Sequence, residues 1–253
     1  MKILNITFSP TGGTKKVADI FANALGQDIQ NIDLTDKELD FSSIAISSND
    51  LCIFAVPAYG GRIPSTATSR IQKLRGNHAK AVLIAVYGNR EFDDTLLELQ
   101  DITTAVGFTS IAGVGAIAEH SIVRQFAANR PDVDDQVELE SFAAKILSIA
   151  EQEHMNPPKL PGNVPYKEIK SSSAKPITDD NCVACGLCAA KCPVGAISME
   201  HPNETDHTLC ISCMRCISVC PKQARSISPD IIAAFTQKLE PVCSLRKSNT
   251  LYL

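Results

Sequence analysis

Eight of the ten cysteines lie between Cys182 and Cys220, in two runs that share one spacing. Each run reads C-x2-C-x2-C-x3-C-P, and Cys210 opens the second run 28 residues after Cys182 opens the first. Three thiolates spaced by three residues can surround one cuboidal cluster from a single tight loop. A pair of zinc sites is the alternative, but zinc prefers two separated Cys-x-x-Cys pairs. The spacing therefore favours iron–sulfur clusters, and such a cysteine cluster points to metal binding rather than to disulfides.

The two runs resemble the bacterial two-cluster ferredoxins over about residues 177–228. In that pattern the fourth Cys of each run ligates the other cluster, which ties the two halves together. It also lets a small segment with little apolar core fold around its metal. The resemblance assigns one [4Fe–4S] cluster to Cys182, Cys185, Cys188 and Cys220, and the other to Cys192, Cys210, Cys213 and Cys216.

A glycine-rich loop at residues 9–14 separates the first expected strand from the first expected helix. Its glycines allow several backbone N–H groups to point inward, its hydroxyls add donors, and the helix amino end adds a favourable dipole. The loop contains neither the Lys of a nucleotide-hydrolysing loop nor the G-x-G-x-x-G pattern of dinucleotide sites. These features predict a phosphate site, with a simple glycine-rich turn as the alternative.

Two later loops, residues 57–61 and 87–90, follow strands that we expect beside the first strand. Ligands of open α/β sheets bind outside the carboxyl ends of such strands. Each loop pairs a tyrosine with glycine, which would allow a ring to stack on a flat ligand and the backbone to approach it closely. The alternative is that each tyrosine only packs at the end of its strand.

The S-x-T-G-x-T pattern of residues 9–14 resembles the FMN phosphate loop of flavodoxins, and the resemblance covers about residues 1–153. It implies a phosphate held by Ser9, Thr11, Gly12, Gly13 and Thr14. It also implies an isoalloxazine flanked by Pro57, Ala58, Tyr59, Gly60, Gly61, Tyr87, Gly88, Asn89 and Arg90. Typical short flavodoxins carry acidic residues near the flavin, whereas Arg62 and Arg90 are basic. A cation near the ring would stabilise the reduced, anionic flavin, and two surface side chains are the alternative.

The segments that must position these loops alternate between apolar runs and amphipathic stretches. We expect strands at residues 2–8, 28–34, 51–56, 79–87 and 109–117, and helices at 14–25, 65–75, 91–106 and 134–153. This alternation predicts an α/β fold with a doubly wound five-stranded parallel sheet, for which the flavodoxin-like order 2-1-3-4-5 is suitable.

The rest of the chain divides by composition. Residues 154–176 are rich in Pro, Gly and Ser and are predicted to be a linker, semi-rigid at the Pro end. A small α+β two-cluster ferredoxin domain is expected at residues 177–228. Residues 229–253 are expected to be a C-terminal extension that begins as a helix. The order resembles proteins in which a flavodoxin-like FMN-binding domain is fused ahead of a two-cluster ferredoxin.

Composition excludes several functional classes. The chain has 253 residues, a net charge of −4 and no Trp, which argues against a nucleic-acid partner. Its longest apolar runs are far shorter than the roughly 20 residues of a membrane span. The first residues lack the pattern of a signal peptide. We therefore expect a cytoplasmic protein without membrane or nucleic-acid partners, and clusters of this kind suit an anaerobic host.

The expected function is electron transfer between two [4Fe–4S] clusters and FMN, with a redox protein or a small-molecule electron acceptor as partner. Clusters pass single electrons and FMN accepts one or holds two, so no catalytic acid or base is required. One alternative is a ferredoxin-fed reductase of a quinone or similar electron-poor acceptor, contacted by His120, Tyr59 or Arg90. Another is an interaction module with a vestigial flavin site. His120 is more often a structural hydrogen-bonding residue, and Cys52 an inert core residue.

Overall fold

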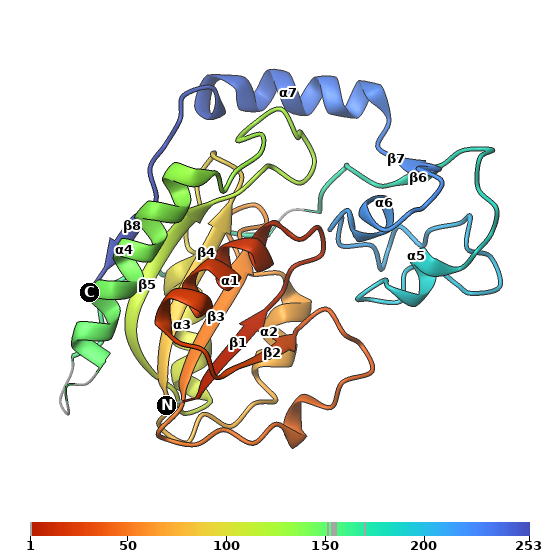
Figure 1. The fold of residues 1–253 in the computed structure, drawn as a ribbon. Coiled ribbons are helices and arrows are strands. Elements are labelled where there is room, and N and C mark those ends of the chain that lie inside the picture. Colours follow the sequence, from red (N-terminus) through yellow and green to blue (C-terminus); the bar gives the residue numbers. More distant parts are fainter. Residues whose placement is uncertain (1, 151, 153–155, 170) are drawn as a thin grey trace.

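The computed structural model describes residues 2–150, 152, 156–169 and 171–253. The larger part is a six-stranded sheet with helices on both faces (Figure 1). Its strands are β1 (Ile3–Thr7), β2 (Ile29–Asp33), β3 (Leu51–Pro57), β4 (Lys80–Tyr87), β5 (Thr109–Ile117) and β8 (Thr250–Tyr252). The order is β2-β1-β3-β4-β5-β8. The first five strands are parallel, so the predicted order 2-1-3-4-5 is confirmed, whereas β8 pairs antiparallel with β5 and was not predicted.

The helices cover the sheet in two layers. Helices α1 (Gly13–Leu25) and α4 (Val133–Ala150) bury their apolar residues against one face. Helices α2 (Ser65–Ile71) and α3 (Thr95–Ala105) pack on the other face, where a short 3-10 helix, η1 (Phe41–Ser43), adds Phe41. Residues 151 and 153 of the expected last helix lie outside the described residues.

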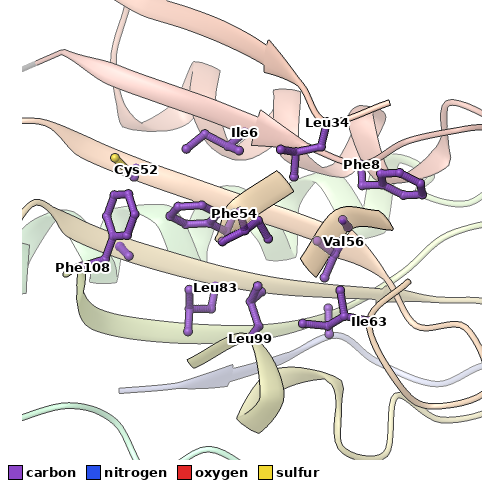
Figure 2. Close-up of a cluster of buried hydrophobic side chains, with 14 of the residues drawn as sticks. Ile6, Phe8, Leu34, Cys52, Phe54, Val56, Ile63, Leu83, Leu99 and Phe108 are labelled. Atoms are coloured by element: carbon purple, nitrogen blue, oxygen red, sulfur yellow. The ribbon is translucent and has the colours of Figure 1, made fainter. Parts of the chain in front are cut away.

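Strand periodicity sorts the core side chains between the two faces. Ile6, Phe54 and Leu83 occupy neighbouring parallel strands and point to the α2–α3 face (Figure 2). Alternate residues such as Ile53 and Ile84 point to the α1–α4 face, as expected for a two-residue period. Cys52 is fully buried in this core, and burial raises the pKa of its thiol to about 12. The thiol is therefore inert, as expected.

The cysteine segment forms a small second part at the carboxyl ends of the strands (Figure 1). Two short helices, α5 (Leu187–Ala190) and α6 (Arg215–Ser218), each carry the third cysteine of their run. Strands β6 (Ile177–Thr178) and β7 (Arg225–Ser226) pair antiparallel beside them. This small α+β unit has few apolar side chains, as expected for a segment that folds around metal.

Both ends of the cysteine segment are attached to the larger part. In the predicted linker, Leu160 packs into the core, and the backbone N–H of Asn163 donates to Asp94 Oδ1 (2.9 Å). Linker residues 154, 155 and 170 lie outside the described residues. At the other end, α7 (Pro229–Cys243) leads from the cysteine segment across to β8 (Figure 1). Of the helices described, none is both long and apolar enough to cross a membrane.

Candidate functional site

The first predicted ligand set comes together around one cavity. Cys182, Cys185 and Cys188 line it from the first run (residues 182–192), and Cys220 lines it from the end of the second run (residues 210–220). Cys185 is exposed, so this cavity lies near the protein surface. The crossed assignment taken from the sequence thus corresponds to four thiols that share one space.

The second ligand set is deeper. Burial raises the pKa of the Cys213 thiol to about 12, and the nearby charges of Cys216, Cys192 and Cys210 raise it as well. Cys192, Cys213 and Cys216 are all buried. The three thiols that act on Cys213 are the other members of its predicted set, so the second set also converges.

The surroundings of both sets suit an anionic cluster. Arg225 is almost fully buried, and among the described residues its guanidinium bonds only neutral oxygens, including Thr205 Oγ1 (2.8 Å) and the carbonyl of Pro202. It lines the first cavity, and while burial raises the pKa of Cys216 in the second set to about 11, the charge of Arg225 opposes that rise. A buried cation is costly without a negative partner, and thiolate-bound clusters would provide one. Iron–sulfur clusters therefore fit these residues.

The thiolates themselves receive backbone donors. The N–H of Ala196 donates to Cys192 Sγ, and that of Ala224 donates to Cys220 Sγ, both at 3.3 Å. Hydrogen bonds of this kind tune cluster potentials. In the described part of the chain, no three His, Cys, Asp or Glu side chains form a group that would hold a single metal ion. Four ligands of a cuboidal cluster bind four different iron atoms and so stand further apart.

The predicted phosphate loop (residues 9–14) lies between β1 and α1. Gly12 is the residue before the helix and has φ +93°, in the left-handed region that favours glycine. A Cβ built there would meet no atom within 4 Å, so the space beside the loop is open. The first turn of α1 contains no acidic residue, which leaves its positive dipole end available to an anion. Ser9 Oγ accepts from the N–H of Lys15 (2.8 Å), and its own hydroxyl hydrogen is still available.

The other two predicted loops lie side by side at the same edge of the sheet. The N–H of Ala58 donates to the carbonyl of Val86 (2.8 Å). Gly60 and Gly61 have φ +63° and +89° between the mutually bonded Tyr59 and Arg62, which makes a tight reversal. The structure therefore brings together residues 57–61 and 87–90. Of their two strands only β3 lies beside β1 as expected, and β4 lies one strand further along the sheet.

Several side chains in these loops are occupied by protein contacts. Tyr87 is buried and packs edge-to-face on Phe92 (5.3 Å), which is the strand-end packing alternative. Asn89 Nδ2 donates to the carbonyls of Cys243 (2.7 Å) and Leu245 (2.8 Å), and Arg90 pairs with Asp93. The carbonyls of Tyr87, Gly88 and Arg90 also accept hydrogen bonds from Ala118, Cys243 and Lys247, so much of this loop is held by the protein itself.

Arg62 does not lie free beside a flavin ring either. Its guanidinium forms a bidentate pair with Glu98 (2.7 and 2.8 Å) and lies 4.7 Å from the ring centre of Tyr166 in the linker. The carboxylate neutralises the cation, so the sequence-based idea that Arg62 raises the flavin potential has no support in this geometry.

His120 lies in the loop after β5, next to Gly88 of the 87–90 loop. Its Nδ1 accepts from the N–H groups of Ile122 (3.2 Å) and Val123 (3.0 Å), so Nε2 carries the proton of the neutral ring. A Cβ at Gly88 would lie 2.6 Å from the His120 ring. Burial, and then the charge of Arg90, lowers the pKa of His120 to about 4. His120 is therefore a neutral residue that packs on the 87–90 loop.

The cysteine segment touches the flavodoxin-like part at several points that the sequence did not predict. Burial raises the pKa of Tyr59, and the charge of Cys213 raises it further. Arg70 Nη2 donates to the carbonyl of Pro193 (2.8 Å), next to Cys192. Arg215 Nη1 donates to the carbonyls of Ser9 and Pro10. A signal was present: Ser212 and Arg215 replace Ala184 and Leu187 at matching positions of the two runs.

Comparisons with known proteins found one family model and several similar solved structures. The family model of the 4Fe-4S dicluster domain matches residues 181–224. Similar solved structures include the flavodoxin of Streptococcus pneumonia TIGR4, with 21% identity, 58% of this chain and 98% of that chain covered, and a TM-score of 0.40. Oxidised flavodoxin 1 from Bacillus cereus has 15% identity, covers 58% and 98%, and has a TM-score of 0.40. Rubredoxin oxygen:oxidoreductase from Desulfovibrio gigas has 17% identity, covers 59% and 36%, and has a TM-score of 0.43.

No curated protein matches the chain. The strand order of the sheet is that of the flavodoxin-like fold, and the match over residues 181–224 falls on both cysteine runs. The chain thus joins a flavodoxin-like fold to a 4Fe–4S dicluster domain.

Proposed function

We propose that the chain is an electron-transfer iron–sulfur flavoprotein that passes electrons between two [4Fe–4S] clusters and FMN. One observation carries the proposal: the second run lies against the loop expected to hold the flavin phosphate, because Arg215, between Cys213 and Cys216, donates to the carbonyls of Ser9 and Pro10. When bound, the clusters supply one-electron transfer and FMN supplies a centre that takes one electron or two. The chain's own residues hold these groups close together and shield the inner set from water.

The residues at the carboxyl edge are suited to FMN. The open space at Gly12 and the anion-free first turn of α1 suit a phosphate group. The backbone of residues 57–61 and 87–90 lies beside it, where the ligands of such sheets bind. These features support FMN rather than a nucleoside triphosphate, because the loop has no P-loop lysine.

The proposal is tested by cofactor analysis of anaerobically purified protein. We expect about eight iron atoms per chain, together with flavin that is released on denaturation. Gly12→Val should abolish FMN binding and retain iron, because its side chain would fill the phosphate space. Gly195→Val is the matched control: Gly195 also has positive φ (+68°) and open space, but it lies in the cysteine segment. Zinc in place of iron after reconstitution, or no affinity for FMN, would overturn the proposal.

A second candidate is a reductase of a small electron-poor acceptor, and a cavity favours it. This cavity of ≈ 380 Å³ lies beside Asn89 and is lined also by Phe126, Arg130, Cys243 and Arg246. Its volume is within the roughly 300–1,000 Å³ of small-molecule sites. Turnover of a soluble quinone faster than by free FMN would support this candidate, and equal rates would remove it.

A further inference from the structure

Arg215 belongs to the second cysteine run, yet its guanidinium contacts the phosphate loop. Nη1 donates to the backbone oxygens of Ser9 (3.1 Å) and Pro10 (3.2 Å). Its Nε is buried and has no hydrogen-bond partner among the described residues. A long cationic side chain is therefore held across the boundary between the two parts of the molecule, although one of its donors stays unsatisfied.

This contact fixes the orientation of a peptide group in the phosphate loop. The bond between Pro10 and Thr11 is trans, and in a trans peptide the N–H points opposite to the C=O. Because Arg215 holds the Pro10 oxygen, the N–H of Thr11 points away from Arg215. The same guanidinium places a positive charge next to a loop that is expected to bind a dianion.

The position of Arg215 depends in turn on the second ligand set. Cys213 and Cys216 flank it in sequence, and its own backbone N–H bonds to the Cys213 thiol. Ile211, on the same run, packs against the core of the larger part. Arg70 reaches back across the boundary to the carbonyl of Pro193, next to the fourth member of the set, Cys192. Ordering the second set therefore orders the side chain that holds the phosphate loop.

We propose that Arg215 is a positioning residue through which the assembled second cluster site prepares the phosphate loop for FMN, so that the two cofactors bind with positive coupling. This inference rests on the proposed function, because it concerns the same flavin. The chemistry that Arg215 serves is a phosphate monoester. Riboflavin has the same ring without the phosphate, so its affinity should not depend on Arg215.

The test compares dissociation constants of FMN and riboflavin for the iron-loaded full chain. Arg215→Ala should weaken FMN binding about tenfold, as expected for loss of a charge-assisted contact, and leave riboflavin within about twofold. Arg215→Lys should recover part of the loss, because it keeps the charge. Leu187→Ala is the matched control, since Leu187 occupies the same position of the first run and is exposed. Unchanged FMN affinity in Arg215→Ala, or equal loss for both flavins, would overturn the inference.

A second measurement needs no variant and serves if Arg215→Ala fails to hold iron. By thermodynamic reciprocity, a ligand favoured by the assembled cluster must also favour that cluster. Saturating FMN should therefore raise the chelator concentration that removes half of the iron at equilibrium from the wild-type protein several-fold more than saturating riboflavin does. Equal protection by the two flavins would contradict the coupling. If the iron-loaded wild type binds neither flavin, it is the proposed function itself that fails.

Discussion

The two cysteine runs have nearly the same backbone. Ala184 and Ser212 occupy matching positions with φ +51° and +55°, and Gly195 and Gln223 match at +68° and +52°. In both runs the N–H four residues after the last cysteine donates to its sulfur at 3.3 Å. The ligand geometry is therefore duplicated, and any difference between the two sites comes from the residues between the ligands.

The two runs differ in solvent exposure: matching side chains are exposed in the first run and packed against other residues in the second. Val183 in the first run is 59% exposed, whereas its counterpart Ile211 packs on the core of the larger part. Gly186 in the first run is matched by Met214 in the second, which keeps the left-handed backbone (φ +62°) and is only 3% exposed. That conformation costs a non-glycine residue about 1–2 kcal/mol. Burial of the Met214 side chain beside Ala174 and the residues of α7 offsets this cost.

This difference teaches that one ligand motif can serve two roles. The first set, with the exposed Cys185, faces the solvent from which a partner would approach. The second set faces the loops expected to hold FMN. The comparison gives the proposed path an order: partner, first cluster, second cluster, flavin.

The largest effect is expected when the second cysteine of each run is replaced, which tests this order. Cys185→Ser and Cys213→Ser should each reduce bound iron from about eight atoms to about four. Only Cys213→Ser should also weaken FMN binding and prevent rapid flavin reduction by the remaining cluster, because it removes the set whose run contacts the phosphate loop through Arg215. Iron analysis, flavin titration and stopped-flow absorbance provide the three readouts. If the two variants lose flavin binding equally, the two runs are not distinct in role.

The order of the sheet and the iron–sulfur character of the cysteine segment could be predicted because their signals are strong and local. Apolar runs such as residues 51–56 are long enough to identify a buried strand, and cysteine spacing fixes ligand order. β8 could not be predicted, because three residues show no usable period. It is positioned by distant contacts: Asn249 Oδ1 accepts from the N–H of Ile117 (2.8 Å), and Asn249 Nδ2 donates to Asp135 (3.0 Å).

The partners of the basic side chains could not be predicted from the sequence either. Arg62 and Arg90 are basic residues beside glycine-rich loops, and composition cannot show that Glu98 and Asp93 neutralise them. Arg70 and Arg215 differ from these two residues, because each contacts a distant loop across the boundary between the two parts. Neither is adjacent in sequence to the loop it contacts, so only the folded arrangement shows their role.

A smaller effect is expected when only the packing of the second run on the larger part is changed. Ile211→Asp places a charge where the second run packs on the larger part, and we expect it to lower stability by about 1–3 kcal/mol, the usual cost of an unpaired buried polar group. Val183→Asp, at the matched and exposed position, should change stability by less than about 0.5 kcal/mol. Anaerobic denaturant unfolding, followed by flavin and cluster absorbance, measures both. Similar losses in the two variants would mean that the boundary contributes little.

A last test, which needs only a difference in slope, concerns His120, whose loop supports the second run. Ile122 packs in the apolar cluster that contains Met214, and its N–H bonds to His120 Nδ1. The first run has no such support from residues 118–130 in the described contacts. Protonation of Nδ1 would break this bond and the bond from Val123.

The pH dependence follows from the pKa of His120, which is lowered to about 4 from an ordinary value near 6.5. Between these values the unfolded chain binds one more proton than the folded chain. His120 therefore makes the protein less stable as pH falls from about 6.5 to about 4, by at most about 1.4 kcal/mol per pH unit. His120→Asn removes this proton while keeping an acceptor, so its stability should fall less steeply with acid. Anaerobic thermal midpoints of the two proteins between pH 5 and 7 measure the difference in slope; parallel curves would show that His120 does not hold the loop that supports the second run.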